Sequence, residues 1–354
     1  MKYFRLLLVL LAVVLLTDLG SAITSRVRAN VSLFEKLPAK KTRLRVMSWN
    51  VENLYDTIPD SVADDREFLP SAPRKWNTTR YWTKQGALAR TILAAGGQQP
   101  VDIIGLCEIE GDSVLKDLCR RTRLARLGYE FVATQSRDPR GMDVGLLYQS
   151  ESFALFQHSG HAIPRLHPDE RPTRDVLLAS GRIPNGDTLD VMVVHFPSRR
   201  GGADLTDTYR VRAAKVVRHL ADSLLQHRHR PQLMVMGDFN DEPQNRSIRE
   251  VLSPTLIPLS AEAHPNPPEG NDEIKGTHYF QGKWSRIDHI LVNPPLLEVS
   301  APLMTTVENC RIFALPYLLD KTPRGAIFPR RTYLGTRYRA GVSDHLPLLL
   351  DLWY

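Results

Sequence analysis

Three cysteines among 354 residues are too few, and odd in number, to build a disulfide framework. Cys107, Cys119 and Cys310 also lack the paired spacing that marks a zinc site. Cys107 lies within an apolar stretch, so we expect it to be a small, buried hydrophobic side chain. The scarcity of cysteine therefore excludes a disulfide-dense module and a cysteine-based zinc protein.

The sequence also lacks a hydrophobic run long enough to span a membrane. Residues 6–16 form an unbroken apolar run of eleven residues, whereas a spanning helix needs roughly 20. This run follows a short basic start and precedes the small residues Gly20 and Ala22, which is the pattern of a secretory signal peptide. We therefore expect residues 1–22 to be removed on export to a periplasm or the cell exterior, and residues 23–42 to lead into the folded domain. The alternative is an uncleaved N-terminal anchor.

No Gly/Ser-rich linker, low-complexity tract or repeat divides the remaining chain, which favours one large domain over residues 43–354. The chain carries 46 basic and 39 acidic residues, a formal net charge of +7, and its isoelectric point is about 9.3. Such a surface attracts polyanions, for example nucleic acid or anionic lipid.

Apolar stretches rich in β-branched residues predict seven strands, at residues 44–49, 101–106, 144–148, 189–194, 233–236, 287–292 and 346–352. Two segments at helical spacing predict helices, one over 83–97 that begins at Thr83 and ends at two glycines, and one over 207–228. This alternation predicts an α/β fold of sheets flanked by helices. The long segments 56–80 and 308–342 lack periodicity. The second is rich in arginine and aromatic residues. Loops this long are often functional, so we expect each segment to be either a rim of the functional site or a solvated insertion.

Polar side chains interrupt the strand ends, where a packed core has no use for them. They are Asn50, Glu52, Glu108, His195, Asp238, Asn240, Asp288, Asp344 and His345. Residues two apart on an extended strand face the same way. We therefore expect Asn50 with Glu52, Glu108 with Glu110, and Asp238 with Asn240 to point at one site. Oxygen ligands without cysteine suit Mg²⁺ or Mn²⁺. A hard cation, two histidines and nearby arginines together suit the cleavage of a phosphate ester.

Seven motifs occur in order along residues 43–354, and together they resemble the endonuclease/exonuclease/phosphatase superfamily, to which deoxyribonuclease I belongs. They read WNVENLYD, DIIGLCEIEG, DVGLLY, HFPSRRGG, GDFND, GKWSRIDHIL and SDHLP. The spellings look most like the secreted bacterial branch of that superfamily. The resemblance implies a four-layer αββα sandwich, with two mixed β-sheets flanked by helices and the site at one edge.

The resemblance also implies a role for each motif residue. The metal-side residues would be Asn50, Glu108 and Asp344. Asp238 would orient or deprotonate the attacking water, and Asn240 would hold that water or a phosphate oxygen. Asp288 would pair with His345, while His195 would bind the phosphate or donate a proton. Residues near these motifs form a set of substrate-binding candidates, which are Glu52, Arg140 and Arg199.

Three functions compete. The first is an exported, Mg²⁺- or Mn²⁺-dependent phosphodiesterase that cleaves nucleic acid, which the basic charge and the arginine-rich segment 308–342 favour. The second is a phosphatase or phospholipase-type enzyme acting on inositol phosphates or sphingolipid head groups. The sequence shows no apolar hairpin rich in Trp or Phe that would favour a membrane-bound version, and Trp76, Tyr81 and Trp82 would form at most a small membrane-facing patch. The third is a non-catalytic polyanion-binding module, which unbroken motifs disfavour. The sequence implies no stable protein partner.

Overall fold

Two mixed β-sheets form the centre of the structure, a computed structural model that describes residues 42–60, 63–266 and 273–354. The expected signal peptide at 1–22 and lead-in at 23–42, apart from Thr42, lie outside these residues. The sheets belong to the unit Arg43–Tyr354. Within the described part of the chain, no helix combines the length and the apolar character needed to cross a bilayer.

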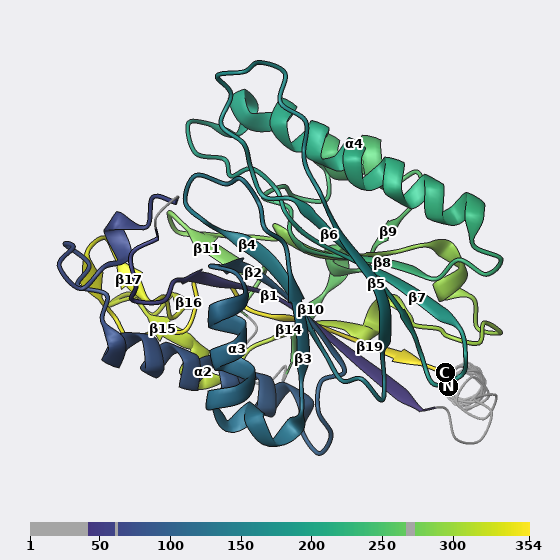
Figure 1. Cartoon of the computed structure of the whole chain (residues 1–354), viewed down its shortest axis with the longest axis horizontal. Coiled ribbons are helices and arrows are strands. Elements are labelled where there is room, and N and C mark those ends of the chain that lie inside the picture. The colour runs from purple at the N-terminus through teal and green to yellow at the C-terminus, as the bar shows by residue number, and fades with distance from the viewer. Residues whose placement is uncertain (1–41, 61–62, 267–272) are drawn as a thin grey trace, which may run out of the picture. The chain divides into compact units, whose positions relative to one another are not determined.

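The first sheet has seven strands with β1 near its centre (Figure 1). Their order is β10 (His264–Asn266), β14 (Cys310–Phe313), β19 (Leu348–Trp353), β1 (Arg43–Leu54), β2 (Ile103–Ile109), β4 (Asp143–Tyr148) and β3 (Glu130–Ala133). β1 runs parallel to β2 and antiparallel to β19. The carboxyl ends of β1 and β2 therefore meet at the edge where the segment before β19 enters the sheet.

The second sheet has six strands. Their order is β5 (Ala154–His161), β6 (Val176–Arg182), β7 (Thr188–His195), β8 (Leu233–Asp238), β13 (Asp288–Val292) and β9 (Ile257–Pro258). β7 and β8 are parallel, whereas β13 runs antiparallel to β8. This mixed order brings the end of β7, the end of β8 and the start of β13 to one edge.

Alternating side chains of the second sheet serve two cores. Val191 and Val193 pack into the core shared with the first sheet, whereas Met192 and Val194 pack into a second core beneath a long helix. The sheets approach closely because residue 105 is glycine: a Cβ there would lie 2.7 Å from Cε of Met236. The sheets thus form the two inner layers of the sandwich.

Helices form the outer layers. α2 (Thr78–Gly96) and α3 (Asp112–Arg121) cover the first sheet, and α4 (Ala203–His227) covers the second (Figure 1). The shorter helices are η1 (Arg66–Phe68), η2 (Arg123–Leu127), the π-helical η3 (Ser247–Leu252), η4 (Leu259–Glu262), η5 (Pro294–Leu297), η6 (Val307–Asn309) and η7 (Pro316–Leu318). The predicted αββα fold class is therefore confirmed.

The predicted start of α2 was wrong. Its N-cap is Asn77, whose side chain accepts a hydrogen bond from the amide of Arg80, and Thr83 lies inside the helix. Asparagine is as good an N-cap as threonine, so the earlier cap begins the helix about one and a half turns sooner. The predicted end at the two glycines is confirmed, as is the burial of Cys107.

The two long segments pack against each other. Segment 308–342 contains the hairpins β15 (Leu319–Lys321)–β16 (Ile327–Pro329) and β17 (Tyr333–Leu334)–β18 (Arg337–Tyr338), while β11 (His278–Phe280) and β12 (Lys283–Ser285) form a third hairpin. Arg74 donates to the carbonyl of Gly335 (2.6 Å), and its guanidinium lies over the ring of Tyr333. Trp76 is fully buried and Tyr81 is 4% exposed. The membrane-facing aromatic patch expected from these residues was wrong, because both rings belong to the core.

Candidate active site

Three candidate side chains form one row across the second sheet. Asp238, the last residue of β8, pairs in register with His195 at the end of β7 and with Asp288 at the start of β13. All three are at least 97% buried. Residues in register on neighbouring strands point to the same face. Because Met236 of β8 faces the first sheet, Asp238, two residues later, faces it too.

Asn50 of β1 joins this row to the first sheet. Its Nδ2 lies 3.0 Å from Oδ2 of Asp238 and 3.3 Å from Oε1 of Glu108. Its Oδ1 accepts the amide hydrogen of Glu52 (3.0 Å). The carboxamide is thus fixed at the junction of the two sheets, and it links the carboxylates of Asp238 and Glu108.

A β-bulge directs Glu108 to the same place. In the ladder with β4, Cys107 pairs with Val144 and Ile109 pairs with Asp143, which leaves Glu108 unpaired between them. The bulge re-aims its side chain, and Oε2 accepts the amide hydrogen of Asn53 (2.8 Å).

Left-handed backbone conformations gather at these strand ends. The backbone angle φ lies between 50° and 63° at Glu52, Asn53, Glu108 and Asn240. Residues other than glycine seldom adopt this region. Strict alternation therefore fails here. The expectation that Glu108 and Glu110 face one site was wrong, because the carboxylate of Glu110 accepts the amide hydrogen of Asp56 instead. Backbone strain of this kind is found where a fold must hold particular groups in place.

Glycine at position 237 is required beside the row. Its φ is +143°, and a Cβ there would lie 1.9 Å from the carbonyl oxygen of Val194. Only glycine therefore lets β8 lie this close to β7 immediately before Asp238.

His345 faces the row from the turn before β19. Its Nδ1 donates to Oδ2 of Asp288 across 2.8 Å, and Asp288 also accepts a hydrogen bond from the hydroxyl of Thr277. The hydroxyl of Ser343 ties this turn to β1 by donating to the carbonyl of Asn50 (2.6 Å). Asp288 therefore fixes the orientation of the imidazole and leaves Nε2 directed toward Asp238, 3.9 Å away.

The surroundings shift the pKa values of the two histidines in opposite directions. Burial alone would lower the pKa of His345, but the charges of Asp288, Asp238 and Asp344 outweigh it and raise the pKa well above its usual value. Burial, followed by the charges of Arg174 and Arg140, lowers the pKa of His195 far below its usual value. His345 is therefore the charged imidazole near neutral pH, and His195 is the neutral one.

Asp238 lies between the two imidazoles. Its Oδ2 is 3.6 Å from Nε2 of His195, and Asn240 donates its amide hydrogen to Oδ1 (2.8 Å). Burial, followed by the charge of Asp288, raises the pKa of Asp238 to about 7. A carboxyl group with such a pKa can both accept and return a proton near neutral pH.

A buried lysine supports the metal-side carboxylates from behind. Nζ of Lys84 donates to the carbonyl of Glu52 and to the hydroxyl of Thr332 (2.7 Å). The carboxylate of Glu52 accepts the amide hydrogen of Thr332 (2.6 Å). Next to Thr332, Arg331 donates to Oδ2 of Asp344 (2.6 Å). These contacts fix Asp344 and make Glu52 a support of the site rather than an open substrate contact.

The other sequence candidates lie around this centre. Asn240 donates from Nδ2 to the carbonyl of Phe196 (3.1 Å). Arg199 donates from Nε to the carbonyl of Asn240 (2.6 Å) and from Nη2 to Oδ1 of Asn245 (2.9 Å), so it braces the loop after β8. Arg140, whose side chain is 44% exposed, lies near Asp138, with a separation of 3.7 Å between Nε and Oδ1.

The donor set fits a hard divalent cation. The site gathers the carboxylates of Glu108, Asp238, Asp288 and Asp344 with imidazole nitrogens, and Cys107 lies fully buried in the sheet beneath it. Two sets of three ligand atoms lie within 4.8 Å of one another, in His278–Asp344–His345 and in Asp238–Asp288–His345. Oxygen-rich donors of this kind hold Mg²⁺ or Mn²⁺. The side chains of Asn50, Glu108 and Asp344 remain the predicted metal ligands.

Sequence reasoning missed several supporting residues. Lys84 had a signal, because it lies at helical spacing between the buried residues Tyr81 and Leu88 of α2. The ring of His278 lies 4.6 Å from the ring of His345 at an interplanar angle of 34°. The amide of Thr332 donates to the carboxylate of Glu52. Neither His278 nor Thr332 lies in a recognisable sequence pattern.

Comparison with known proteins shows the family of the chain. The sequence model of the Endonuclease/Exonuclease/phosphatase family matches residues 45–353. No curated protein sequence is similar enough to count as a match.

Many solved structures share the fold. An endonuclease/exonuclease/phosphatase family protein from Bacteroides thetaiotaomicron is 17% identical with a TM-score of 0.56, over 89% of this chain and 99% of that one. A mannosyl-6-phosphatase from the same organism is 16% identical with a TM-score of 0.54, over 88% and 100% of the chains. The human nocturnin catalytic domain with bound sulfate is 15% identical with a TM-score of 0.53, over 89% and 98%.

Proposed function

The chain belongs to the endonuclease/exonuclease/phosphatase family, and on that basis we propose that it is an exported, Mg²⁺- or Mn²⁺-dependent phosphodiesterase acting on nucleic acid. One observation carries this proposal: the buried, hydrogen-bonded pair of Asp288 and His345 lies beside Asp238 at the edge where both sheets end. A paired imidazolium beside a carboxyl group of pKa about 7 is suited to phosphate-ester hydrolysis.

Each side chain has a role that its surroundings support. Asp238 accepts the proton of the attacking water, which its raised pKa allows. His345, held in its charged form by Asp288, stabilises negative charge on the phosphoryl oxygens. Neutral His195 offers a hydrogen bond to the phosphate from the opposite side of Asp238. Asn240 holds the water or a phosphate oxygen beside Asp238.

The residues that would hold the divalent cation are Asn50, Glu108 and Asp344. Such a cation neutralises charge on the phosphate as the ester is cleaved. Asn50 now presents Nδ2 to Glu108, so its oxygen would serve as a ligand only after the carboxamide has rotated. The pairing of Arg331 with Asp344 keeps one carboxylate in place for the cation.

The net charge of +7 supports nucleic acid as the substrate and the apolar run at residues 6–16 supports export, in keeping with the secreted bacterial branch of the family. A phosphatase or phospholipase-type activity on inositol phosphates or sphingolipid head groups is the alternative. A non-catalytic polyanion-binding role is not favoured, because none of the seven motifs is broken in the sequence. No stable protein partner is proposed.

A substrate panel tests the proposal. Residues 23–354 are assayed with Mg²⁺ or Mn²⁺ on supercoiled plasmid, structured RNA, bis-p-nitrophenyl phosphate and phosphomonoesters, with His345→Ala in parallel. We expect nicking of plasmid or cleavage of RNA, reduced by about 10²–10⁴-fold in the variant. Cleavage of small or lipid-derived esters alone would support the proposed hydrolytic chemistry but contradict nucleic acid as the substrate. No hydrolysis by a folded, metal-loaded protein would overturn the proposal.

A further inference from the structure

A groove opens beside His195 and encloses about 700 Å³. Its walls are the segments 138–140, 163–174 and 197–200 and the first turns of α4. Six arginines line it against three acidic residues: Arg140, Arg165, Arg171, Arg174, Arg200 and Arg212 face Asp138, Asp169 and Glu170. The groove therefore has an excess of positive charge, although none of the expected nucleic-acid contacts at 308–342 lies in it.

Arg174 is the buried cation of this groove. It is 6% exposed, and it donates from Nη2 to the carbonyl of Phe196 (2.8 Å) and from Nη1 to Oδ2 of Asp138 (3.2 Å). Its Nε is buried and has no hydrogen-bond partner among the described residues. The hydroxyl of Thr173, which also lines the groove, lacks a partner in the same way. Buried donors are rarely left unpaired, and both residues belong to the lining of the groove.

One backbone carbonyl links the wall of the groove to the catalytic centre. The carbonyl of Phe196 accepts hydrogen bonds both from Arg174 and from Nδ2 of Asn240. Burial alone would lower the pKa of Arg140, but nearby negative charges raise it overall, and the largest of these effects comes from Glu108. Arg140 therefore belongs both to the groove and to the electrostatic surroundings of Glu108.

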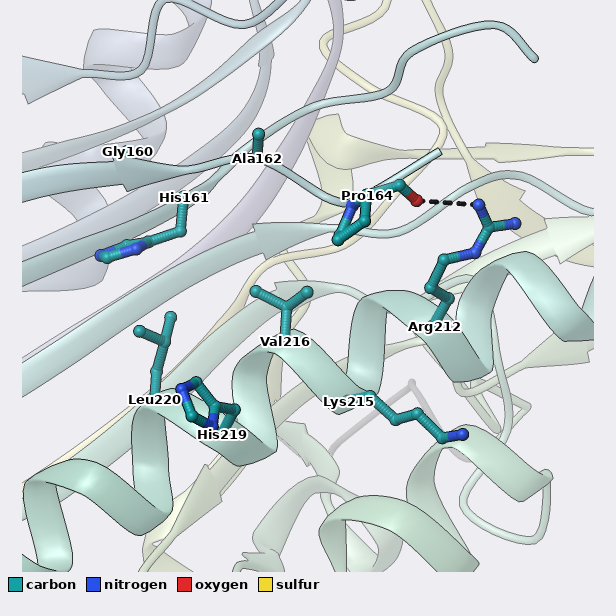
Figure 2. Close-up of a pocket in the computed structure, with 9 residues that line it drawn as sticks. All are labelled: Gly160, His161, Ala162, Pro164, Arg212, Lys215, Val216, His219 and Leu220. Carbon is teal, nitrogen blue, oxygen red and sulfur yellow. Dashed lines mark hydrogen bonds between the residues drawn. The ribbon is translucent and has the colours of Figure 1, made fainter. Parts of the chain in front are cut away.

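The outer wall is fixed before any ligand binds. Nη1 of Arg212, from α4, donates to the carbonyl of Pro164 and to the carboxylate of Glu170, both at 2.8 Å. Figure 2 shows the first contact from the adjoining hollow, where Val216 and Leu220 of α4 face the segment after Gly160. The segment that carries Arg171 is thus held against the helix, so little ordering remains to be done when a ligand binds.

Two arginines of the groove remain available to a ligand. Arg171 and Arg200 are exposed, and neither forms an ion pair within the described ranges. By contrast, the arginines of the 308–342 segment are partly engaged. Arg331 pairs with Asp344, and Arg339 pairs with Asp320.

We propose that this groove binds a second phosphate of the substrate, at a distance from the phosphate that is cleaved. The proposal rests on the phosphoesterase function proposed above and defines its substrate class: a phosphate ester with a further phosphate on the side of His195. Arg174 and Thr173 donate to that phosphate from the floor, while Arg171 and Arg200 contact it from the rim. Arginine suits this task because its planar fork binds phosphate oxygens in pairs.

Binding of two nucleotides tests the groove without any turnover. Thymidine 3′,5′-bisphosphate and thymidine 5′-monophosphate are titrated calorimetrically into the wild-type protein and into Arg171→Gln, Arg200→Gln and the double variant. We expect the bisphosphate to bind at least about tenfold more tightly than the monophosphate, and each single variant to remove several-fold of this preference. Arg126→Gln, an exposed arginine of η2, is the matched control and should change neither affinity.

Hydrolysis gives the second readout. Thymidine 5′-(p-nitrophenyl phosphate) is compared with the same ester carrying a 3′-phosphate, and the groove variants should reduce kcat/KM for the second substrate only. Arg174→Gln should reduce the preference further. If that variant fails to fold, the two rim variants still decide the outcome.

The outcomes separate the two proposals. Equal affinity of the wild-type protein for both nucleotides would overturn the proposal that the groove binds a second phosphate. A preference for the bisphosphate that survives in the double variant would overturn it as well. If the double variant loses the preference for the bisphosphate and neither ester is hydrolysed, the phosphate-binding groove is supported and the phosphoesterase function is overturned.

Discussion

Nδ1 of His345 and Oδ2 of Asp288 lie 2.8 Å apart, and this hydrogen bond joins the turn before β19 to the first residue of β13. The pair explains why the sequence places an acid and an imidazole where two strands begin. Its partners come from opposite sheets, so the contact exists only when the whole sandwich has formed.

Asp288→Asn tests this pair. The amide keeps the shape but removes the negative charge that stabilises the imidazolium, so the pKa of His345 should fall and kcat should drop by about 10²–10⁴-fold at neutral pH. NMR titration of His345 and steady-state kinetics measure the two effects. An unchanged imidazole pKa would show that Asp288 does not hold the charge.

Removal of the metal should abolish activity. Treatment with a chelator should eliminate hydrolysis, and Mg²⁺ or Mn²⁺ should restore it. Glu108→Gln should raise the Mn²⁺ dissociation constant by about tenfold or more, because the site loses a charged oxygen ligand. Direct Mn²⁺ binding, followed by electron paramagnetic resonance, measures this change.

Glu110→Gln is the matched control for Glu108→Gln. The Glu110 carboxylate accepts the amide hydrogen of Asp56, so it is bound outside the cluster. If the two variants bound Mn²⁺ equally well, Glu108 would not be a ligand.

Lys84→Met should lower the free energy of unfolding. It leaves the carbonyl of Glu52 and the hydroxyl of Thr332 without their buried donor, at a cost of about 1–3 kcal/mol. Urea denaturation measures the loss, with Lys116→Met on the exposed side of α3 as the control. Equal stability of the two variants would contradict the supporting role of Lys84.

Asp351→Asn tests a structural ion pair far from the chemistry. Arg45 contacts both carboxylate oxygens of Asp351 at 2.7 and 2.8 Å, and Arg311 contacts one at 2.6 Å. Burial alone would raise the pKa of Asp351, but the two arginines lower it overall. The stabilisation is therefore fully present above the unfolded-state pKa of about 3.9 and is lost as the pH falls through the lower folded-state pKa.

The substitution should lower the free energy of unfolding by about 1–3 kcal/mol at pH 7. Denaturation between pH 7 and pH 2 should show the difference from the wild-type protein narrowing below about pH 4. A difference that stays constant with pH would mean that Asp351 acts through packing and not through its charge.

Strand positions and the fold class could be predicted from the sequence, because buried strands leave continuous apolar runs and the polar residues at their ends stand out. The edge clusters around Asp238 and His345 were visible for this reason. The start of α2 was misplaced because Thr83 was taken as the cap, although Asn77, an equally good local cap, lies earlier in the chain.

The pairing of Asp288 with His345 was predicted from the resemblance, but the surroundings of Glu108, Trp76 and Arg174 could not be. Strict alternation along β2 would direct the side chain of Glu108 away from the site. The β-bulge that directs it toward the site depends on the pairing of β2 with β4, which the sequence does not reveal. The burial of Trp76 against segment 308–342 depends on contacts between distant parts of the chain. The groove around Arg174 was equally invisible, since three separate segments and a helix build it.

The neighbouring positions of β1 and β19 have a consequence for biosynthesis. β1 is the first strand of the sheet to be translated, and it pairs along its length with β19, the last, from Arg43–Trp353 to Ser48–Leu348. A ribosome-bound chain therefore exposes one side of β1 until residue 353 has emerged. The polypeptide should remain without hydrolytic activity throughout synthesis, so any nucleic acid near the ribosome would meet only an incomplete centre.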